Sequence, residues 1–262
     1  MIRRPPRSTQ GVSSAASDVY KRQVVEDGMV KQITTTPFED YQVTDHTHPL
    51  DHVQLLAPVV PGKVVAIALN YSTHLGERPA PKRVEGFYKP HNCIIADGEN
   101  IVLPADAGRV DEEGELVVII GKTAKNVSKG DALDFVMGYT IGNDVSARDW
   151  QNGPEKDMQW WRAKGADTFG PLGPFISTDI DPFDFTIQVT VNGEKTENVA
   201  HSRDLIFDIP TVIAEISKYV TLDPGDIIYS GTPGRTSQLQ PGDVVEVEIP
   251  GIGVLRNSVI SE

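Results

Sequence analysis

Cysteine is nearly absent from this chain of 262 residues, since Cys93 is the single one. A disulfide within the chain is therefore excluded, and one lone thiol is typical of a reducing compartment, so we expect a cytoplasmic protein. Long hydrophobic runs are absent too. No stretch reaches the roughly 18 consecutive apolar residues that a membrane helix needs, and the first residues lack the apolar core of a signal peptide.

Positive charge is scarce. Lys and Arg number 24 against 37 Asp and Glu, which gives a formal net charge of −13. Such a chain repels phosphate backbones and anionic lipids, so we expect neither nucleic acid nor a membrane as a partner. The sequence also lacks a glycine-rich phosphate loop, a Gly-x-Ser-x-Gly nucleophile elbow and a Cys-x-x-Cys zinc pattern.

Composition divides the chain into three segments. Residues 1–23 are basic, rich in Ser and Pro, and without useful periodicity. They resemble a translated sequencing adapter, so we expect a non-native or disordered tail that lies outside the fold. Residues 24–60 are rich in loops with short alternating stretches, which predicts a small lead-in that contains β structure. Residues 61–262 form the main domain.

Short apolar runs separated by turn residues predict strands in the main domain. The runs are 64–69, 94–95, 116–120, 136–141, 187–191, 227–229 and 244–249. Asn192-Gly193 predicts a two-residue hairpin turn. Apolar residues at helical spacing predict one helix over 209–220, with Asp208 as its N-cap, and 159–166 is a weaker candidate. We therefore expect a mainly β, α+β fold with few helices, closer to a rolled sheet than to βαβ units.

Acidic residues border two of the predicted strands. Glu113 and Glu115 are two apart directly before the run 116–120, so on a strand both side chains point to the same face. Asp144 follows the run 136–141. Three converging carboxylates suit a hard divalent cation, with coordination positions left for water or substrate.

A His-x-x-Glu pair upstream, His74 and Glu77, would supply a base and a group that orients it. Each feature also has an ordinary interpretation. Acidic pairs at strand starts are usually solvated, a His and a Glu three apart can form a surface pair on a helix, and Lys164 can be an exposed lysine. Their order along the chain and their joint occurrence favour a functional site.

Taken together, the motifs from about residue 63 to residue 259 resemble those of the fumarylacetoacetate hydrolase family. They are Asn70-Tyr71-x-x-His74-x-x-Glu77, Phe87-Tyr88-Lys89-Pro90, Glu113-Gly114-Glu115-Leu116, Asn143-Asp144-Val145-Ser146-Ala147-Arg148-Asp149, Lys164-Gly165-Ala166-Asp167-Thr168-Phe169-Gly170-Pro171 and Ser230-Gly231-Thr232-Pro233. The resemblance implies a mixed β-sandwich roll of the fumarylacetoacetase C-terminal-domain type, usually a homodimer, with 61–262 as its catalytic domain.

The resemblance also implies residue roles. Three carboxylates match the family's Mg²⁺ or Mn²⁺ ligands: Glu113, Glu115 and Asp144. Three residues match its catalytic groups: His74 and Glu77, which activate water from a flexible segment that closes over the site, and Lys164 beside the metal. Three residues fall at positions that commonly contact substrate: Arg148, Gln151 and Thr232.

The leading interpretation is a divalent-metal-dependent hydrolase that cleaves a C–C bond in acylpyruvate-type or β-diketo acids through a metal-stabilised enolate. The alternative is an oxaloacetate decarboxylase, or an isomerase of the 2-hydroxymuconate or hydroxyheptadienedioate type, using the same site. A β-rich binding module without catalysis conflicts with the intact residue set. The substrate is expected to be a small dicarboxylic or keto acid, with specificity set near Phe87, Trp160, Trp161 and Arg203.

Overall fold

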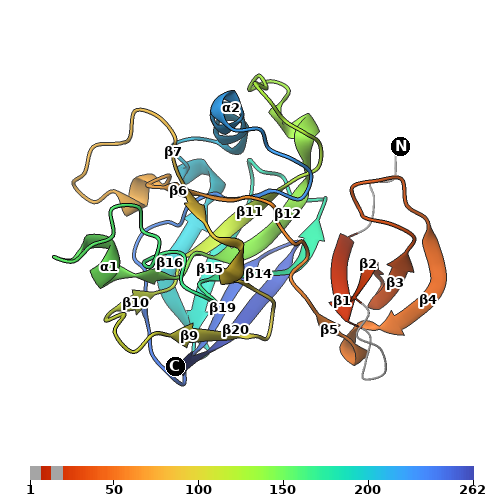
Figure 1. The fold of residues 1–262 in the computed structure, drawn as a ribbon, viewed down its shortest axis with the longest axis horizontal. Helices are drawn as coiled ribbons and strands as arrows, with labels where there is room; N and C mark the ends of the chain where they lie inside the picture. Colours follow the sequence, from red (N-terminus) through yellow and green to blue (C-terminus); the bar gives the residue numbers. More distant parts are fainter. Residues whose placement is uncertain (1–6, 13–19) are drawn as a thin grey trace.

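The computed structural model describes residues 7–12 and 20–262. Strands dominate this part of the chain and form three sheets (Figure 1). It holds two α-helices, α1 (Arg148–Asn152) and α2 (Ile209–Tyr219). Single 3₁₀ turns are η1 (Leu50–His52), η2 (Ser72–His74), η3 (His91–Cys93), η4 (Ala132–Phe135) and η5 (Ser202–Asp204). The predicted mainly β fold with few helices is confirmed.

The largest sheet has twelve strands and runs through the whole molecule. Along the main path it holds β4 (Val43–Pro49), β3 (Met29–Ile33), β2 (Tyr20–Glu26), β1 (Arg7–Val12), β14 (Gly170–Ser177), β12 (Val136–Asn143), β11 (Gly114–Ile120), β17 (Ile227–Tyr229), β6 (Val64–Ala68) and β7 (Glu85–Lys89). Off this path, β5 (Gln54–Leu55) pairs with β1, and β8 (Ile94–Ile95) pairs with β14. Neighbours along the path are antiparallel except β17 and β6, which are parallel.

A second sheet of five strands packs on the first. Its order is β16 (Glu194–His201), β15 (Thr186–Val191), β19 (Val244–Ile249), β20 (Gly253–Ser261) and β9 (Asn100–Leu103). A small third sheet joins β13 (Ser146–Ala147), β10 (Val110–Asp111) and β18 (Gln238–Leu239). Strands β15, β19 and β20 lie against β11, β12 and β14 (Figure 1), which gives the expected mixed β sandwich.

Both faces of β11 are buried, which explains its uninterrupted apolar sequence. Leu116, Val118 and Ile120 belong to the core cluster that includes residues of β15 and β19. Val117 and Ile119 point to the opposite face and join a second cluster with residues of β6, β14 and β17. A strand covered on both sides holds the acidic residues at its start in a fixed position.

The local predictions for strands and helix agree with the structure. Each of the seven predicted runs forms a strand, although β6 ends at Ala68 because Leu69 has a φ of +56°. Asp208 caps α2, since its Oδ1 accepts a hydrogen bond of 3.0 Å from the Thr211 amide. Asn192 and Gly193 both have positive φ, as the predicted hairpin turn requires.

The helix considered over 159–166 is wrong. The segment folds as a series of turns, with single helix-like bonds from the Lys164 amide to the Trp160 carbonyl oxygen and from the Ala166 amide to that of Arg162. Trp160 has a φ of +55°, which interrupts a right-handed helix. The turns bring Lys164 into the protein interior, where it is buried.

The basic segment 1–23 differs from the expected disordered tail where it is described. Arg7–Val12 forms β1 and pairs along its length with Tyr20–Glu26 in β2. Backbone pairing in a hairpin requires no apolar periodicity, so the sequence pattern gave no sign of it. Residues 1–6 and 13–19 lie outside the described residues, and the non-native origin of the segment stays a prediction. Figure 1 shows β1 to β5 as a smaller lobe beside the sandwich.

In the described ranges, neither α-helix has the length and apolar character that crossing a bilayer requires.

Candidate metal centre and catalytic cavity

The three predicted ligand carboxylates come together at one end of the β11–β12 pair. Gly114 pairs with Asn143, and the Asp144 amide donates a hydrogen bond of 2.9 Å to the Glu113 carbonyl oxygen. Asp144 therefore lies opposite Glu113, with Glu115 two residues along the same face. One oxygen from each carboxylate lies within 4.8 Å of the others. All three residues are buried, with at most 5% of their surface exposed.

This donor set fits a hard divalent cation. Burial raises the pKa of Glu115, and the nearby carboxylates of Asp144 and Glu113 raise it further. Its Oε2 accepts one hydrogen bond, of 2.7 Å, from the Gly231 amide. A cation held among these oxygens would relieve the repulsion and favour the charged form of each carboxyl group.

Lys164 lies directly beside two of the carboxylates. Its Nζ is 2.6 Å from Glu113 Oε2 and 2.7 Å from Asp144 Oδ2. Burial alone would lower the pKa of Lys164, but Asp144 and Glu113 outweigh it and the pKa is raised. Burial would likewise raise the pKa of Glu113, yet Lys164 and Arg148 bring it below its usual range. The site therefore holds a fixed ammonium group against a fixed carboxylate.

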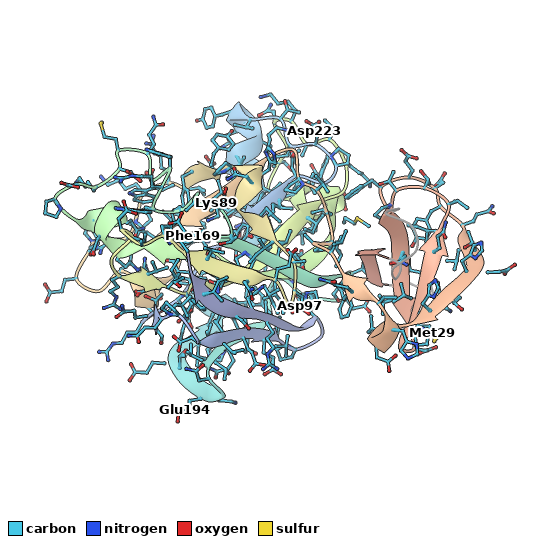
Figure 2. The ribbon with its side chains drawn as sticks, turned by 60° about the horizontal axis from the view of Figure 1, so that its bottom comes forward. Met29, Lys89, Asp97, Phe169, Glu194 and Asp223 are labelled. Carbon is cyan, nitrogen blue, oxygen red and sulfur yellow. The ribbon has the colours of Figure 1, made fainter. Side chains whose placement is uncertain are left out.

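Lys89 is a site residue that the sequence reasoning missed. Its side chain is fully buried, and its Nζ donates to Asp144 Oδ1 at 2.5 Å, to the Phe169 carbonyl oxygen at 3.1 Å and to the Lys164 carbonyl oxygen. Figure 2 shows Lys89 and Phe169 close together inside the sandwich. The motif Phe87-Tyr88-Lys89-Pro90 was the available signal, although it does not reveal that the lysine is buried.

Arg148 lines the cavity and also contacts the carboxylate of Glu113. Its Nη1 is 2.7 Å from Glu113 Oε1 and 2.9 Å from Gln151 Oε1, and its Nε is 2.9 Å from Asp111 Oδ2. Its Nη2 donates to Thr236 Oγ1 at 2.8 Å. In this arrangement the guanidinium orients Glu113.

A cavity of about 320 Å³ lies beside Glu113, Asp144 and their cationic partners Lys164 and Arg148. Seven of the nine predicted site residues line it: His74, Glu113, Asp144, Arg148, Gln151, Lys164 and Thr232. Glu115 is buried outside the lining, where its carboxylate still reaches the other two. Glu77 is exposed and is not part of the lining.

His74 ends η2 and contributes its ring to the cavity wall. Its Nδ1 lies 3.2 Å from the Gly234 carbonyl oxygen, which can only accept, so Nδ1 carries the proton and Nε2 is the basic nitrogen. Burial lowers the pKa of the ring below its usual value. The chain turns at Gly76, with a φ of +58°, so no helix brings Glu77 onto the same face as His74.

Glu112 is a second buried acid that the sequence reasoning did not single out. Adjacent to Glu113 but on the opposite face, its carboxylate accepts hydrogen bonds of 2.9 Å from the Ser237 amide and 2.8 Å from Asn198 Nδ2. Burial raises the pKa of Glu112 to about 8. It anchors the loop that carries Thr232, whose Oγ1 donates to the Gly114 carbonyl oxygen at 3.1 Å.

Of the four residues expected to set specificity, two line the acidic cavity. Phe87 and Trp160 form an edge-to-face pair there, with ring centroids 5.3 Å apart. Trp161 borders a separate surface hollow, and Arg203 lies in η5 outside the lining.

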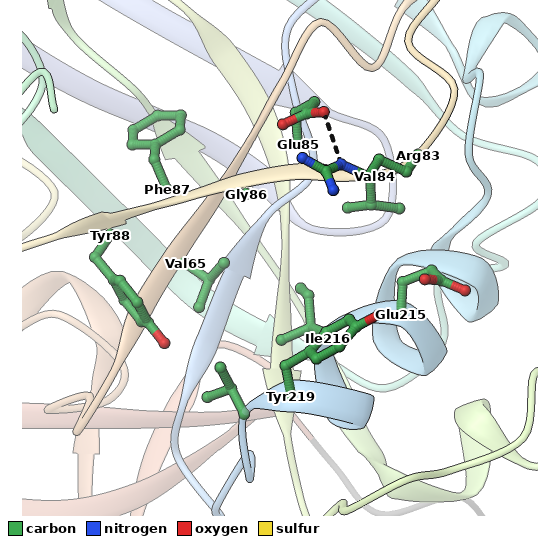
Figure 3. Close-up of a pocket in the computed structure, with 11 residues that line it drawn as sticks. Val65, Arg83, Val84, Glu85, Gly86, Phe87, Tyr88, Glu215, Ile216 and Tyr219 are labelled. Atoms are coloured by element: carbon green, nitrogen blue, oxygen red, sulfur yellow. Dashed lines mark hydrogen bonds and ion pairs between the residues drawn. The ribbon is translucent and has the colours of Figure 1, made fainter. Parts of the chain in front are cut away.

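A cavity of similar volume lies between β7 and α2 (Figure 3). Val65, Ile216 and Tyr219 line it, and its rim carries the ion pair of Arg83 with Glu85 at 3.1 Å. Glu113 and Asp144 line the other cavity, and the Glu115 carboxylate lies within reach of both. The acidic cavity is therefore the better candidate for chemistry.

Known proteins match both parts of the chain. The family described as Fumarylacetoacetate (FAA) hydrolase C-terminal matches residues 63–260, and the family described as Rv2993c-like, N-terminal matches residues 24–58. The chain is 40% identical over 225 residues to oxaloacetate tautomerase FAHD2A, mitochondrial, of Bos taurus. That match covers 81% of this chain and 71% of the bovine protein.

Two solved structures share the fold over nearly the whole chain. One is described as 5-carboxymethyl-2-hydroxymuconate delta-isomerase from Mycobacterium smegmatis, with 41% identity and a TM-score of 0.89, covering 98% of this chain and 100% of that one. The other is maleylpyruvate hydrolase from Sphingobium sp. SYK-6 in complex with manganese(II) and pyruvate. It is 29% identical, with a TM-score of 0.79 and coverage of 97% and 99%.

Proposed function

Because the chain belongs to the fumarylacetoacetate hydrolase family, we propose that it is a divalent-metal-dependent hydrolase that cleaves a C–C bond in an acylpyruvate-type or β-diketo acid. The buried group of Glu113, Glu115 and Asp144 carries this proposal. Three converging carboxylates suit Mg²⁺ or Mn²⁺. The maleylpyruvate hydrolase that shares this fold is described as a complex with manganese(II) and pyruvate, which supports the proposal of a metal-dependent hydrolase.

The chemistry requires stabilisation of an enolate. Breaking the C–C bond places negative charge on a substrate oxygen, and a divalent cation held by the three carboxylates would supply Lewis acidity there. Lys164 keeps a charged ammonium group in the same cavity and stabilises the developing charge. Arg148 fixes the Glu113 carboxylate, so the ligand needs little reorganisation during the reaction.

Hydrolysis also requires an activated water, and His74 is the proposed base. Donation from Nδ1 to the Gly234 carbonyl oxygen leaves Nε2 able to accept a proton from water. The lowered pKa keeps the ring neutral near pH 7. Glu77 is proposed to orient the ring or the water, and this role requires the segment after η2 to close over the cavity, because Glu77 is exposed.

A second candidate function uses the same site without an attacking water. In the arrangement described, Glu77 lies outside the cavity, so the pair that would activate water is not assembled. Isomerisation of a hydroxymuconate-type dienoate and decarboxylation of oxaloacetate both proceed through an enolate and need no water. The names of the bovine tautomerase and the mycobacterial isomerase favour this alternative.

Turnover of a small substrate panel separates the two candidates. Acetylpyruvate, fumarylpyruvate, oxaloacetate and a hydroxymuconate-type dienoate are followed by ultraviolet absorbance with Mg²⁺, with Mn²⁺ and with EDTA. Metal-dependent cleavage of an acylpyruvate supports the hydrolase. Turnover of oxaloacetate or the dienoate alone contradicts hydrolysis and supports the alternative.

Removing one ligand charge tests the metal site. Glu115→Gln keeps the shape of the side chain but removes an anionic ligand, so we expect turnover to fall at least 100-fold while the fold persists. Steady-state rates and circular dichroism are the measurements. Glu194→Gln is the matched control, since Glu194 is exposed at the start of β16 and outside the cavity lining, and it should keep most of the activity. Full activity in Glu115→Gln would exclude this group as the metal site.

Assembly and location belong to the same proposal. We expect a homodimer in the cytoplasm that binds neither nucleic acid nor membrane. Exposed aromatic side chains such as Tyr88, Trp161 and Tyr219 supply apolar surface for a second copy to cover. Sedimentation equilibrium of the purified chain measures the oligomeric state.

A further inference from the structure

We propose that Glu112 is a positioning residue for His74, because it fixes the loop 232–237, whose Gly234 carbonyl oxygen decides which nitrogen of the His74 ring is basic. This inference rests on the proposed function, since it concerns the base of that reaction. Glu112 is fully buried and absent from the cavity lining, so it acts through the loop and not on the substrate.

The loop joins β17 to β18 and has no regular secondary structure of its own. Hydrogen bonds outside the sheet ladders must therefore define its position. Two of its groups contact site residues. The Gly234 carbonyl oxygen lies 3.2 Å from His74 Nδ1. Thr236 Oγ1 accepts a hydrogen bond of 2.8 Å from Arg148 Nη2 and donates one of 2.8 Å to Asp111 Oδ2. A displacement of the loop would thus reach the proposed base.

The Glu112 carboxyl group ties the two ends of the loop to each other. At the far end, its Oε1 accepts a hydrogen bond of 2.9 Å from the Ser237 amide, and the Glu112 amide donates one of 3.1 Å to the Ser237 carbonyl oxygen. At the start of the loop, Asn198 Nδ2 lies 2.8 Å from Glu112 Oε2 and 3.4 Å from Thr232 Oγ1. Glu112 and Asn198 are both fully buried, so these contacts are shielded from water.

The contacts around Gly234 itself are weaker. Its amide donates to Thr73 Oγ1 at 3.2 Å, on the surface. The next residue, Arg235, pairs with Glu197 at 3.1 Å, but both side chains are exposed and such a pair contributes little. The position of the Gly234 carbonyl oxygen therefore depends on how the ends of the loop are held.

The tautomer of His74 follows from that position. A carbonyl oxygen can only accept, so its contact with Nδ1 keeps the proton there and leaves Nε2 as the basic nitrogen. Free imidazole side chains favour the proton on Nε2. Without the Gly234 contact, the ring would revert to that form and Nε2 could no longer accept a proton from water.

The ligand carboxylates are held independently of the loop. Glu113 is paired with Lys164 and Arg148, and Asp144 with Lys89 and Lys164. A change at Glu112 that loosens the loop should therefore alter the His74 tautomer and leave the affinity for a divalent cation nearly unchanged.

Nuclear magnetic resonance reads the tautomer directly and without substrate. Long-range ¹H–¹⁵N correlation spectra of the full chain with labelled histidine, at neutral pH with Mg²⁺, show which ring nitrogen is protonated. His74→Gln identifies the signals of His74 by their loss. We expect the unaltered chain to carry the proton on Nδ1.

Two variants of Glu112 separate position from charge. Glu112→Asp keeps the charge but withdraws the carboxyl oxygens by about 1.5 Å, so the Nε2-protonated form should predominate. Glu112→Gln removes the charge but keeps the reach to Ser237, and its amide can donate to Asn198 Oδ1, which has no partner among the described residues. It should restore the Nδ1-protonated form.

Activity and metal binding accompany the spectra. In Glu112→Asp we expect kcat for the acid that is hydrolysed to fall about tenfold or more, with much of it recovered in Glu112→Gln. The dissociation constant of Mn²⁺ should change less than about threefold, against the 10–100-fold typical when support of a ligand is lost. Circular dichroism confirms the fold.

A second site and a matched control complete the set. Asn198→Ala releases only the start of the loop, so it should shift the tautomer in the same direction and decides the matter if Glu112→Asp does not fold. Glu99→Asp is the control. Glu99 Oε2 also accepts a hydrogen bond from a loop amide, that of Ala96 at 2.6 Å, but outside the cavity lining, so the His74 tautomer should stay unchanged.

The outcomes separate this inference from the proposed function. An Nδ1 proton that persists in the folded Glu112→Asp and Asn198→Ala variants overturns the role of Glu112. A loss in Glu112→Gln as large as in Glu112→Asp also overturns it, as does a weakening of Mn²⁺ binding by more than about tenfold, which would place the effect at the ligands. Absence of metal-dependent turnover of every acid in the panel by the unaltered chain overturns the proposed function instead, whatever the tautomer.

Discussion

At the scale of single residues, the site depends on buried charges that neutralise one another. Asp144 receives two ammonium groups, from Lys89 and Lys164, and Glu113 receives Lys164 and Arg148. Breaking any of these pairs leaves an uncompensated buried charge, which is costly in a low-dielectric interior. The side chains are therefore held in one arrangement before any ligand arrives.

His74 should govern the acid limb of the pH profile. Because burial lowers its pKa, we expect kcat/KM for hydrolysis to rise with pH along a limb whose midpoint lies below about 6.5. Rates from pH 5 to pH 8 measure it. The free energy of unfolding depends on pH in the same direction. The contribution of the neutral buried His74 ring is complete above the pKa of His74 in the unfolded chain, and it is lost as pH falls from that value through the lowered pKa of the folded state. An acid limb that persists in His74→Gln would assign the titration to another group.

At the scale of secondary-structure elements, sequence periodicity predicted those features of the site that depend on the local backbone conformation. The spacing of Glu113 and Glu115 placed both carboxylates on one face, because strand alternation is local. The helix cap at Asp208 was equally readable. The burial of Lys89 and the exposure of Glu77 could not be predicted from the sequence, because they depend on how distant segments pack. The positive φ of Trp160 replaces the helix expected over 159–166 with turns. Sheet order, including the pairing of β1 with β14, is non-local for the same reason.

The β11–β12 pair tolerates no side chain at Gly142. A Cβ there would lie 2.3 Å from Tyr229 Cε1 and 2.5 Å from Val117 Cγ2. We expect Gly142→Ala to lower the free energy of unfolding by about 1–3 kcal/mol through overpacking, and to weaken Mn²⁺ binding by moving Asp144. Urea unfolding and metal titration measure both effects.

The matched control for this strand variant is Gly130→Ala. A Cβ at Gly130 meets only Ser128 Oγ, at 3.7 Å, so the free energy of unfolding should change little. If Gly142→Ala were as stable as Gly130→Ala, the close packing of β12 against β17 would not constrain the ligand strands.

At the scale of the whole molecule, stability should depend on the metal. A cation that binds the folded chain at 100 times its dissociation constant adds about 2.7 kcal/mol to the free energy of unfolding. For a domain of this size we expect Tm to rise on the order of 5–10 °C. Differential scanning fluorimetry with Mg²⁺, with Mn²⁺ and with EDTA, at matched ionic strength, measures the shift. A shift of equal size in Glu115→Gln would show that it arises from general screening of the net charge of −13.

The position of the ligands on adjoining antiparallel strands has a consequence for the order of assembly. The Glu113 amide donates a hydrogen bond to Asn143 Oδ1, and these residues are 30 apart in the sequence. Glu115 and its amide donor Gly231 are 116 residues apart. Closing the shorter loop costs less chain entropy and is expected to occur earlier during folding. A nascent chain would then acquire affinity for its cation before the loop after β17 arrives, and the ion would select the correct strand register while the rest of the catalytic cavity is still forming.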